Sequence, residues 1–207
     1  MHKSVLGMEA LMHRVPHPVR AAMASLEARD AADRIDGTPR SQRLRAIAPE
    51  VGPFLLTLAL SNRSRTIVEI GTSGGYSTLW LAVAAQQTDG RVITFEIDPA
   101  KVELARATFA DAEVEDRVEL RSIDGAVGLA ALAASADLVF LDAEKEDYLR
   151  LLEPAIEALR PGGLLIADNL TSHEADLADF RETALTDPRL GGLVVPIGRG
   201  EPVAVRL

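Results

Sequence analysis

Two aspartates and an asparagine follow apolar runs in the second half of the chain. Asp142 ends the run DLVFLD, and Asp168 and Asn169 follow LLIA. Carboxylate and amide oxygens with no adjacent His or Cys suit Mg²⁺, Mn²⁺ or Ca²⁺ rather than zinc. Aspartates at strand ends also commonly cap the helices that follow. These residues therefore fit either a divalent cation site or helix capping.

Lys145 lies three residues after Asp142, in the stretch DAEKEDY. If this loop begins a helix, the two side chains share a face. A metal ion disfavours the charged form of a neighbouring lysine, which could then act as a general base near neutral pH. The alternative is a surface lysine among acids.

A second group of residues indicates a nucleotide-type site. The stretch TIVEIGTSGGYSTLWL, residues 66–81, begins as a β-branched run and passes through glycines into an apolar helix. Glycines let the backbone approach a ligand, and a helix N-terminus favours an anion. The spacing is G-x-x-G-G and not the dinucleotide pattern G-x-G-x-x-G. Glu96 ends the run RVITFE, 21 residues after Gly75, near the ~20 expected for a carboxylate that binds ribose hydroxyls.

The elements that must position these residues alternate between strand and helix. Such alternation predicts a doubly wound, Rossmann-like α/β fold, with a mostly parallel seven-stranded sheet and helices on both faces. A Pro-Gly-Gly turn at 161–163 should end the helix before the fifth strand, and Ser41 could cap a short helix. The expected strands are 66–68, 91–96, 118–122, 137–142 and 164–167, plus a C-terminal antiparallel hairpin over 193–196 and 203–207. The expected helices are 8–15, 19–33, 51–61, from Tyr76 onward, 101–110, after Gly125, 148–159 and 175–185.

Composition limits the function classes. A chain of 207 residues predicts one α/β domain at 45–207 with an N-terminal helical extension at 1–44. The net charge of −9 disfavours broad nucleic-acid binding and anionic membranes. Because cysteine is absent, there is no disulfide or thiolate chemistry. With no membrane span and no signal-peptide pattern, we expect a soluble, cytoplasmic protein.

Five motifs together resemble one known family. The chain is similar to the cation-dependent class I S-adenosylmethionine (SAM) O-methyltransferases, the group that includes caffeoyl-CoA and catechol O-methyltransferases. The resemblance covers about residues 45–207 in family order, whereas residues 1–44 match only loosely. The motifs are VEIGTSGGYST (68–78), ITFEIDP (93–99), DLVFLDAEKEDY (137–148), LRPGGLLIADN (159–169) and PIGRGEPVAVRL (196–207).

The resemblance implies a role for each matching residue. Lys145 would be the base, and Asp142, Asp168 and Asn169 would bind the divalent cation, most simply Mg²⁺. The implied cofactor contacts are Glu69, Gly71 and Ser77 at the methionine end with Ser73 and Asp142 nearby, Glu96 at both ribose hydroxyls, and Asp124 near the adenine.

The sequence departs from the family pattern at three places. The usual Asp-Ala-Asp-Lys-x-Asn-Tyr is DAEKEDY here, which changes positions 144 and 147 outside the ligand set. The third strand is followed by IDGA and not Gly-Asp-Ala, which weakens the role of Asp124. After Asn169 the family often has an aromatic wall, whereas this chain has LTSH at 170–173; His173 could contact substrate, act as an alternative base or cap the next helix.

The sequence therefore predicts an O-methyltransferase that acts on a hydroxyl of a small, catechol-like molecule and forms a homodimer through its N-terminal helices. One alternative is methylation of a tRNA hydroxyl, supported by the arginines of residues 14–45 and opposed by the net charge of −9. An NAD-dependent oxidoreductase is a second, opposed by the missing dinucleotide pattern. A non-catalytic cofactor-binding protein is the third.

Overall fold

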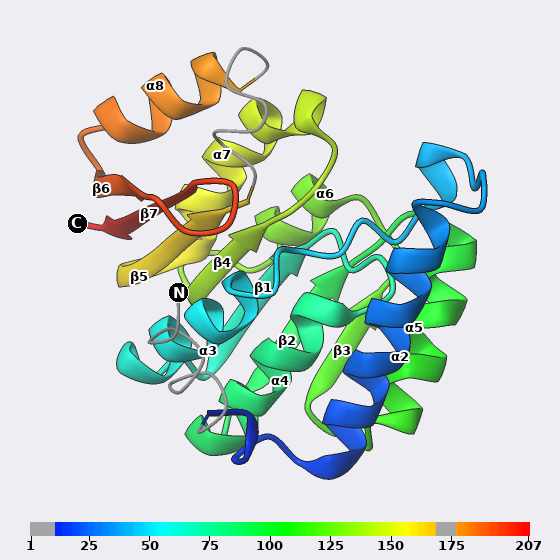
Figure 1. The fold of residues 1–207 in the computed structure, drawn as a ribbon. Coiled ribbons are helices and arrows are strands. Elements are labelled where there is room, and N and C mark those ends of the chain that lie inside the picture. The colour runs from blue at the N-terminus through cyan, green and yellow to red at the C-terminus, as the bar shows by residue number, and fades with distance from the viewer. Residues whose placement is uncertain (1–10, 169–176) are drawn as a thin grey trace.

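The computed structural model describes residues 11–168 and 177–207. Within them, seven strands form one sheet in the order β3-β2-β1-β4-β5-β7-β6 (Figure 1). The first five strands are parallel, and β7 runs antiparallel to both β5 and β6. The predicted fold class is confirmed. The strands are β1 (Thr66–Ile70), β2 (Arg91–Phe95), β3 (Val118–Arg121), β4 (Ala136–Leu141), β5 (Leu159–Ala167), β6 (Leu190–Val195) and β7 (Glu201–Arg206).

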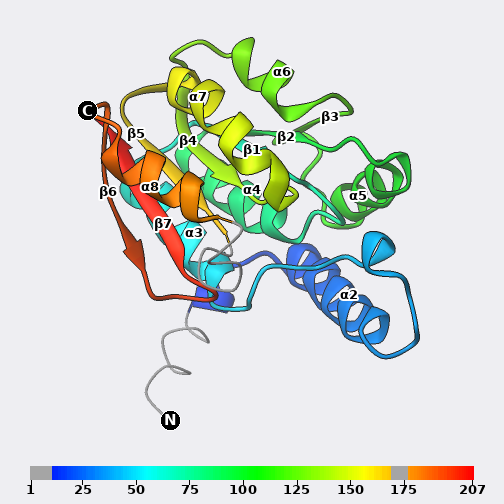
Figure 2. The same cartoon turned by 90° about the horizontal axis from the view of Figure 1, so that it is seen from above.

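Helices cover both faces of the sheet (Figure 2). Because side chains alternate along a strand, Ile67 and Phe140 pack on one face, while Val68 and Leu141 pack on the other. The first face carries α3 (Val51–Ser61), α4 (Tyr76–Thr88) and α5 (Pro99–Asp111), with α2 (His17–Asp33) outside α4 and α5. The second carries α6 (Gly125–Ala130), α7 (Tyr148–Ala158) and α8 (Ala178–Thr186).

The N-terminal region contributes directly to the core. Val19, Met23 and Leu26 of α2 are buried in the same cluster as Trp80 of α4. The division into an extension at 1–44 and a domain at 45–207 stays a prediction. In the part of the chain that the structure describes, no helix is both long and apolar enough to cross a membrane.

Three local predictions need correction. β5 begins at Leu159 and not at Leu164, because Leu159 pairs with Ala136 and the register then shifts before Leu164 pairs with Leu138. The Pro-Gly-Gly segment forms a bulge inside the strand and not a turn before it.

The hairpin strands are longer than expected, starting at residues 190 and 201. Ser41 caps nothing, since it lies inside a 3₁₀ turn (Arg40–Gln42) without a side-chain cap bond. The expected helices at 8–15 and 175–185 lie partly outside the described residues.

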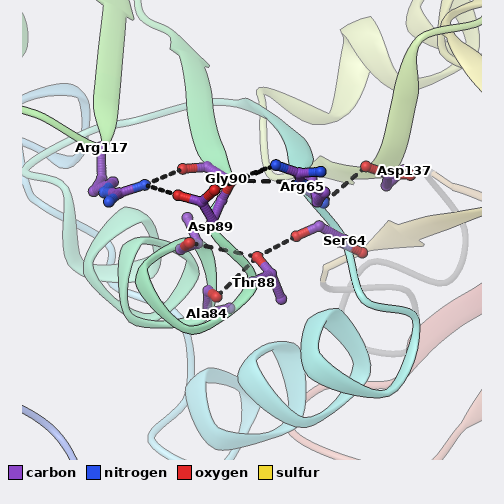
Figure 3. A network of polar contacts seen from close by, with 9 residues as sticks. Ser64, Arg65, Ala84, Thr88, Asp89, Gly90, Arg117 and Asp137 are labelled. Atoms are coloured by element: carbon purple, nitrogen blue, oxygen red, sulfur yellow. Dashed lines mark hydrogen bonds and ion pairs between the residues drawn. The ribbon is translucent and has the colours of Figure 1, made fainter.

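A polar network ties the strand starts together at the end of the sheet opposite the acids (Figure 3). One carboxylate oxygen of Asp137 accepts from the backbone N–H groups of Arg65, at 2.8 Å, and Thr66, at 2.7 Å. Its other oxygen accepts from Arg160 Nε. Arg117 joins the network through Asp89, whose side chain is 81% exposed. Asp137 therefore fixes the start of β1 against β4.

We expect Asp137→Asn to lower the free energy of unfolding by about 1–3 kcal/mol, because an amide group would face either two N–H donors or a guanidinium. The matched change Asp89→Asn should cost less than about 1 kcal/mol, since exposed ion pairs contribute little. Urea denaturation of both variants gives the comparison. Equal losses would show that the buried acceptor has no special role.

Candidate active site

A cavity of about 350 Å³ lies at the carboxyl ends of the parallel strands. Its walls bring together seven of the residues that the sequence singled out: Gly71, Ser73, Glu96, Asp124, Asp142, Lys145 and Asp168. A small cavity of about 20 Å³ adjoins it and adds Ser77, while sharing Gly71, Ser73 and Asp142. Glu69 lines neither cavity, and Asn169 and His173 lie outside the described residues.

The glycine-rich turn after β1 has an unusual backbone. Gly71 has φ of +98°, Ser73 +49° and Gly75 +94°. A Cβ on Gly71 would lie 2.1 Å from the carbonyl oxygen of Asp142, so only glycine fits between β1 and β4. Ser73 Oγ donates to the carbonyl of Leu44 at 2.7 Å. The turn is thereby joined to the segment 40–48, called the strap below, which forms one wall of the large cavity.

Glu69 is fully buried beneath the turn. Its carboxylate accepts from Ser77 Oγ and Thr94 Oγ1, each at 2.6 Å, and from Thr78 Oγ1. Burial raises the pKa of the Glu69 carboxyl. The hydrogen bonds from the three hydroxyl groups act in the opposite direction and lower it. Glu69 fixes the position of the Ser77 hydroxyl from beneath the turn. Its direct contact with a cofactor stays a prediction.

Glu96 directly follows β2 and faces the turn. One oxygen accepts from Ser73 N at 2.8 Å, and the other accepts from the N–H groups of Ile97 and Asp98 at 2.9 and 3.0 Å. These bonds fix the carboxylate at the wall of the large cavity, which is the location that a ribose-binding acid requires.

Asp124 has two functions in the fold. It caps α6 by accepting from Ala126 N at 2.9 Å and Val127 N at 3.3 Å, and it forms a two-pronged pair with Arg150 at 3.0 Å for each contact. The Arg150 guanidinium lowers the pKa of the Asp124 carboxyl. The carboxylate is thus held at the cavity wall in its charged form.

Asp142 and Asp168 meet because β4 and β5 are neighbours. The backbone N–H of Asp142 donates to Ile70 O at 2.9 Å, and that of Asp168 donates to Leu141 O at 3.0 Å. Burial, and then the charge of Asp168, raise the pKa of Asp142 to about 7. Among the described residues, no group of three His, Cys, Asp or Glu side chains could hold a metal ion. The predicted third ligand, Asn169, lies outside that range.

Lys145 lies beside this acid pair. It begins a 3₁₀ turn (Lys145–Asp147), and its Nζ is 3.8 Å from Asp142 Oδ1. The Nζ also donates to the hydroxyl of Tyr148 at 3.1 Å. Only 13% of the Lys145 side chain is exposed, and burial lowers its pKa. A lysine held in this way is suited to accept a proton.

Known proteins carry the same fold and sequence pattern. Residues 38–206 match the model of a family described as O-methyltransferase. The chain belongs to the O-methyltransferase family. A catechol O-methyltransferase of Mycobacterium tuberculosis is 39% identical over 160 residues, which are 77% of this chain and 69% of that protein. This match and the family model confirm the methyltransferase class predicted from the motifs.

Two solved structures illustrate how far the likeness extends. The O-methyltransferase from Bacillus cereus in complex with SAH has a TM-score of 0.77 at 27% identity, covering 90% of this chain and 91% of that one. An O-methyltransferase from Streptomyces achromogenes involved in tomaymycin synthesis, in complex with SAM, has a TM-score of 0.72 at 30% identity, covering 87% and 88%.

Sequence reasoning missed two parts of this O-methyltransferase site. Arg45 of the strap lines both cavities and pairs with Glu144. The two residues are 99 positions apart, so no local spacing indicates the pair. The only signal was the abundance of arginine in residues 14–45. Tyr148 is the second, since it contacts Lys145 Nζ and its hydroxyl lies 3.1 Å from the carbonyl oxygens of Leu141 and Asp168.

Glu201, at the start of β7, is a further buried acid next to the site. Burial and hydrogen bonding to Asp168 raise its pKa from 4.5 to about 10. An acid with a raised pKa in the folded state holds its proton there while the unfolded chain releases it. The contribution of Glu201 to the free energy of unfolding is therefore at its maximum below about pH 4.5, and it declines as the pH rises toward 10.

We therefore expect the metal-free protein to lose stability between about pH 5 and 9, with a slope from Glu201 approaching 1.4 kcal/mol per pH unit. Asp142 adds to this slope up to about pH 7. Glu201→Gln should flatten the profile, whereas Glu103→Gln, an exposed change on α5, should leave it unaltered. Urea denaturation in EDTA at several pH values tests this. A profile for Glu201→Gln that matches the wild type would contradict it.

Proposed function

We propose that the protein transfers the methyl group of SAM to one hydroxyl of a small molecule with two vicinal, catechol-like hydroxyls, with the help of a divalent cation. The observation that carries this proposal is that one cavity is lined both by Glu96, which is placed as a ribose-binding acid would be, and by Asp142, Asp168 and Lys145. The SAH and SAM named in the two solved relatives, and the catechol O-methyltransferase name of the M. tuberculosis protein, support it.

The cofactor would lie across the ends of β1, β2 and β3. Glu96 would accept the ribose hydroxyls, and Asp124 would lie near the adenine. Gly71, Ser73 and Ser77 line the small cavity, which would receive the methionine end, with Glu69 orienting Ser77 from below. Nearby carboxylates would favour the positive charge of the sulfonium.

The residues at the ends of β4 and β5 fit a divalent cation. Asp142 and Asp168 offer hard oxygen ligands, and their mutual repulsion, seen in the raised pKa of Asp142, is relieved by a positive ion. Asp142, Asp168 and Asn169 would hold it. The cation would supply Lewis-acid polarisation, which lowers the pKa of the acceptor hydroxyl and orients it.

Lys145 would act as the base. A phenol with a pKa of ~10 is a poor nucleophile at neutral pH. The neutral Nζ, positioned by Tyr148, would take the hydroxyl proton as the oxygen attacks the methyl carbon. The new C–O bond forms while the S–C bond breaks, which leaves S-adenosylhomocysteine and a methyl ether. Lys145 then returns the proton to solvent.

Calorimetric titration tests the proposal. S-adenosylhomocysteine should bind first, and a catechol such as caffeic acid should gain measurable affinity only when Mg²⁺ is added. Exhaustive treatment with EDTA should lower turnover at least about tenfold. Full activity after chelation would refute the role of the cation. Cofactor binding without catechol affinity in Mg²⁺ would instead point to another class of acceptor.

The protein is also proposed to be a homodimer with its N-terminal helices at the contact, by analogy with relatives of this kind. Sedimentation equilibrium should then give a mass of twice 22.2 kDa. A monomer mass at micromolar concentration would refute this.

A further inference from the structure

The strap holds Arg45 in a fixed position between the two cavities. Arg45 has φ of +52°, a left-handed conformation that is uncommon outside glycine. The bonds on either side hold it there: Leu44 N donates to Asp33 Oδ2 at 3.1 Å, and Ala46 N donates to Asp30 Oδ1 at 3.3 Å. Both acids belong to α2. The direction of the arginine side chain is therefore set by the fold.

Only part of the Arg45 guanidinium is used within the protein. Nη1 donates to Glu144 Oε2 at 3.1 Å, and Nη2 donates to the other oxygen of the same carboxylate. Nε is buried and has no hydrogen-bond partner among the described residues. Because Nη1 and Nη2 each carry two N–H groups in fixed directions, Glu144 uses one N–H of each, and the second N–H of each is left for another acceptor.

The small cavity has the charges that a zwitterion needs. Among the described residues that line it, Arg45 alone carries a positive charge and Asp142 alone a negative one. Ser77 at the start of α4 adds a hydroxyl, and the helix N-terminus favours an anion. Apolar side chains, including those of Leu26, Leu44 and Ile47, close the remaining wall. An α-amino acid group fits this pattern, with its carboxylate toward Arg45.

We infer that Arg45 binds the carboxylate of the cofactor's methionine end through the guanidinium N–H groups that Glu144 does not use, with Glu144 holding the guanidinium in place. This inference rests on the proposed function, because it takes SAM as the ligand. It also assigns a purpose to Glu144, one of the positions where the chain departs from its family's pattern.

A pair of ligands tests the inference without requiring turnover. S-adenosylhomocysteine carries the amino acid end, whereas 5′-methylthioadenosine has the same nucleoside and sulfur without it. Arg45→Met should weaken S-adenosylhomocysteine binding about tenfold or more, and 5′-methylthioadenosine binding by less than about twofold. Arg45→Lys keeps the positive charge but not the planar guanidinium with its two parallel donors. It should therefore weaken S-adenosylhomocysteine binding less than Arg45→Met does. Arg40→Met, in the same strap but absent from the wall of the small cavity, should change the binding of S-adenosylhomocysteine and of 5′-methylthioadenosine by the same factor.

The outcomes separate this inference from the proposed function. Equal weakening of both ligands by Arg45→Met would mean that Arg45 supports the strap and does not bind the carboxylate, and the inference would be wrong. Unchanged binding of both would also overturn it. If the wild-type protein fails to bind S-adenosylhomocysteine, the proposed function fails first.

Discussion

Lys145→Met is expected to lower kcat by about 10²- to 10⁴-fold, the usual contribution of a positioned general base. Methionine keeps most of the length of the side chain, and Tyr148 can retain its contacts with the carbonyls of Leu141 and Asp168. Lys145 is not among the residues proposed to contact the cofactor, so the Kd for S-adenosylhomocysteine should change by less than about twofold. Turnover measured beside calorimetric titration separates these two effects.

The pH dependence gives a second readout of the same group. Burial lowers the pKa of Lys145 below 10.5, and the neutral amine is the active form. Wild-type kcat should therefore rise with pH through a pKa below 10.5, and Lys145→Met should lose this rise. Lys101→Met removes another lysine from the cavity wall and should keep the wild-type profile. If Lys145→Met turns over substrate at the wild-type rate, Lys145 is not the general base.

Gly71→Ala is expected to weaken S-adenosylhomocysteine binding at least about 100-fold or to lower the free energy of unfolding by about 3 kcal/mol or more. The added carbon would lie 2.1 Å from a backbone oxygen of Asp142, and no side-chain rotation can relieve that overlap. The turn would have to move away from β4, which would separate the two halves of the cavity.

Gly37→Ala is the matched control for backbone strain. Gly37 has φ of +87°, but nothing lies within 4 Å of the carbon that alanine would add. It should therefore cost only the ~1–2 kcal/mol of the left-handed conformation, without affecting the ligand. Calorimetric titration and urea denaturation measure both quantities. If Gly71→Ala behaves like Gly37→Ala, close packing at the turn is unimportant.

The sequence predicts the part of the site that depends on local pattern. Gly71 and Glu96 are found by their place after a strand, and Asp142 and Asp168 are found because the carboxyl ends of parallel strands meet. The bounds of α3, 51–61, match because proline and apolar spacing are local signals. The family was predicted from motifs of the same local kind, and the family model and the M. tuberculosis relative confirm it.

The remainder depends on contacts between distant segments. Arg45 meets Glu144 only after α2 has fixed the strap, and no spacing encodes that approach. Glu201 is buried because β7 pairs with β5, whereas the predicted strand began two residues later. The start of β5 was missed because a Pro-Gly-Gly segment is typical of a turn between a helix and a strand, and here the sheet contains it as a bulge.

The strand order divides the reaction between two halves of one sheet. β1 lies between β2 and β4, so Gly71, Glu96 and Asp124 follow strands on one side, while Asp142, Asp168 and Glu201 belong to strands on the other. Under the proposed function, substitutions in β4 to β7 and their loops could change the methyl acceptor while the residues proposed to bind the methyl donor stay the same. Arg45 and Glu144 join the two halves, and they are where such an exchange would require paired substitutions.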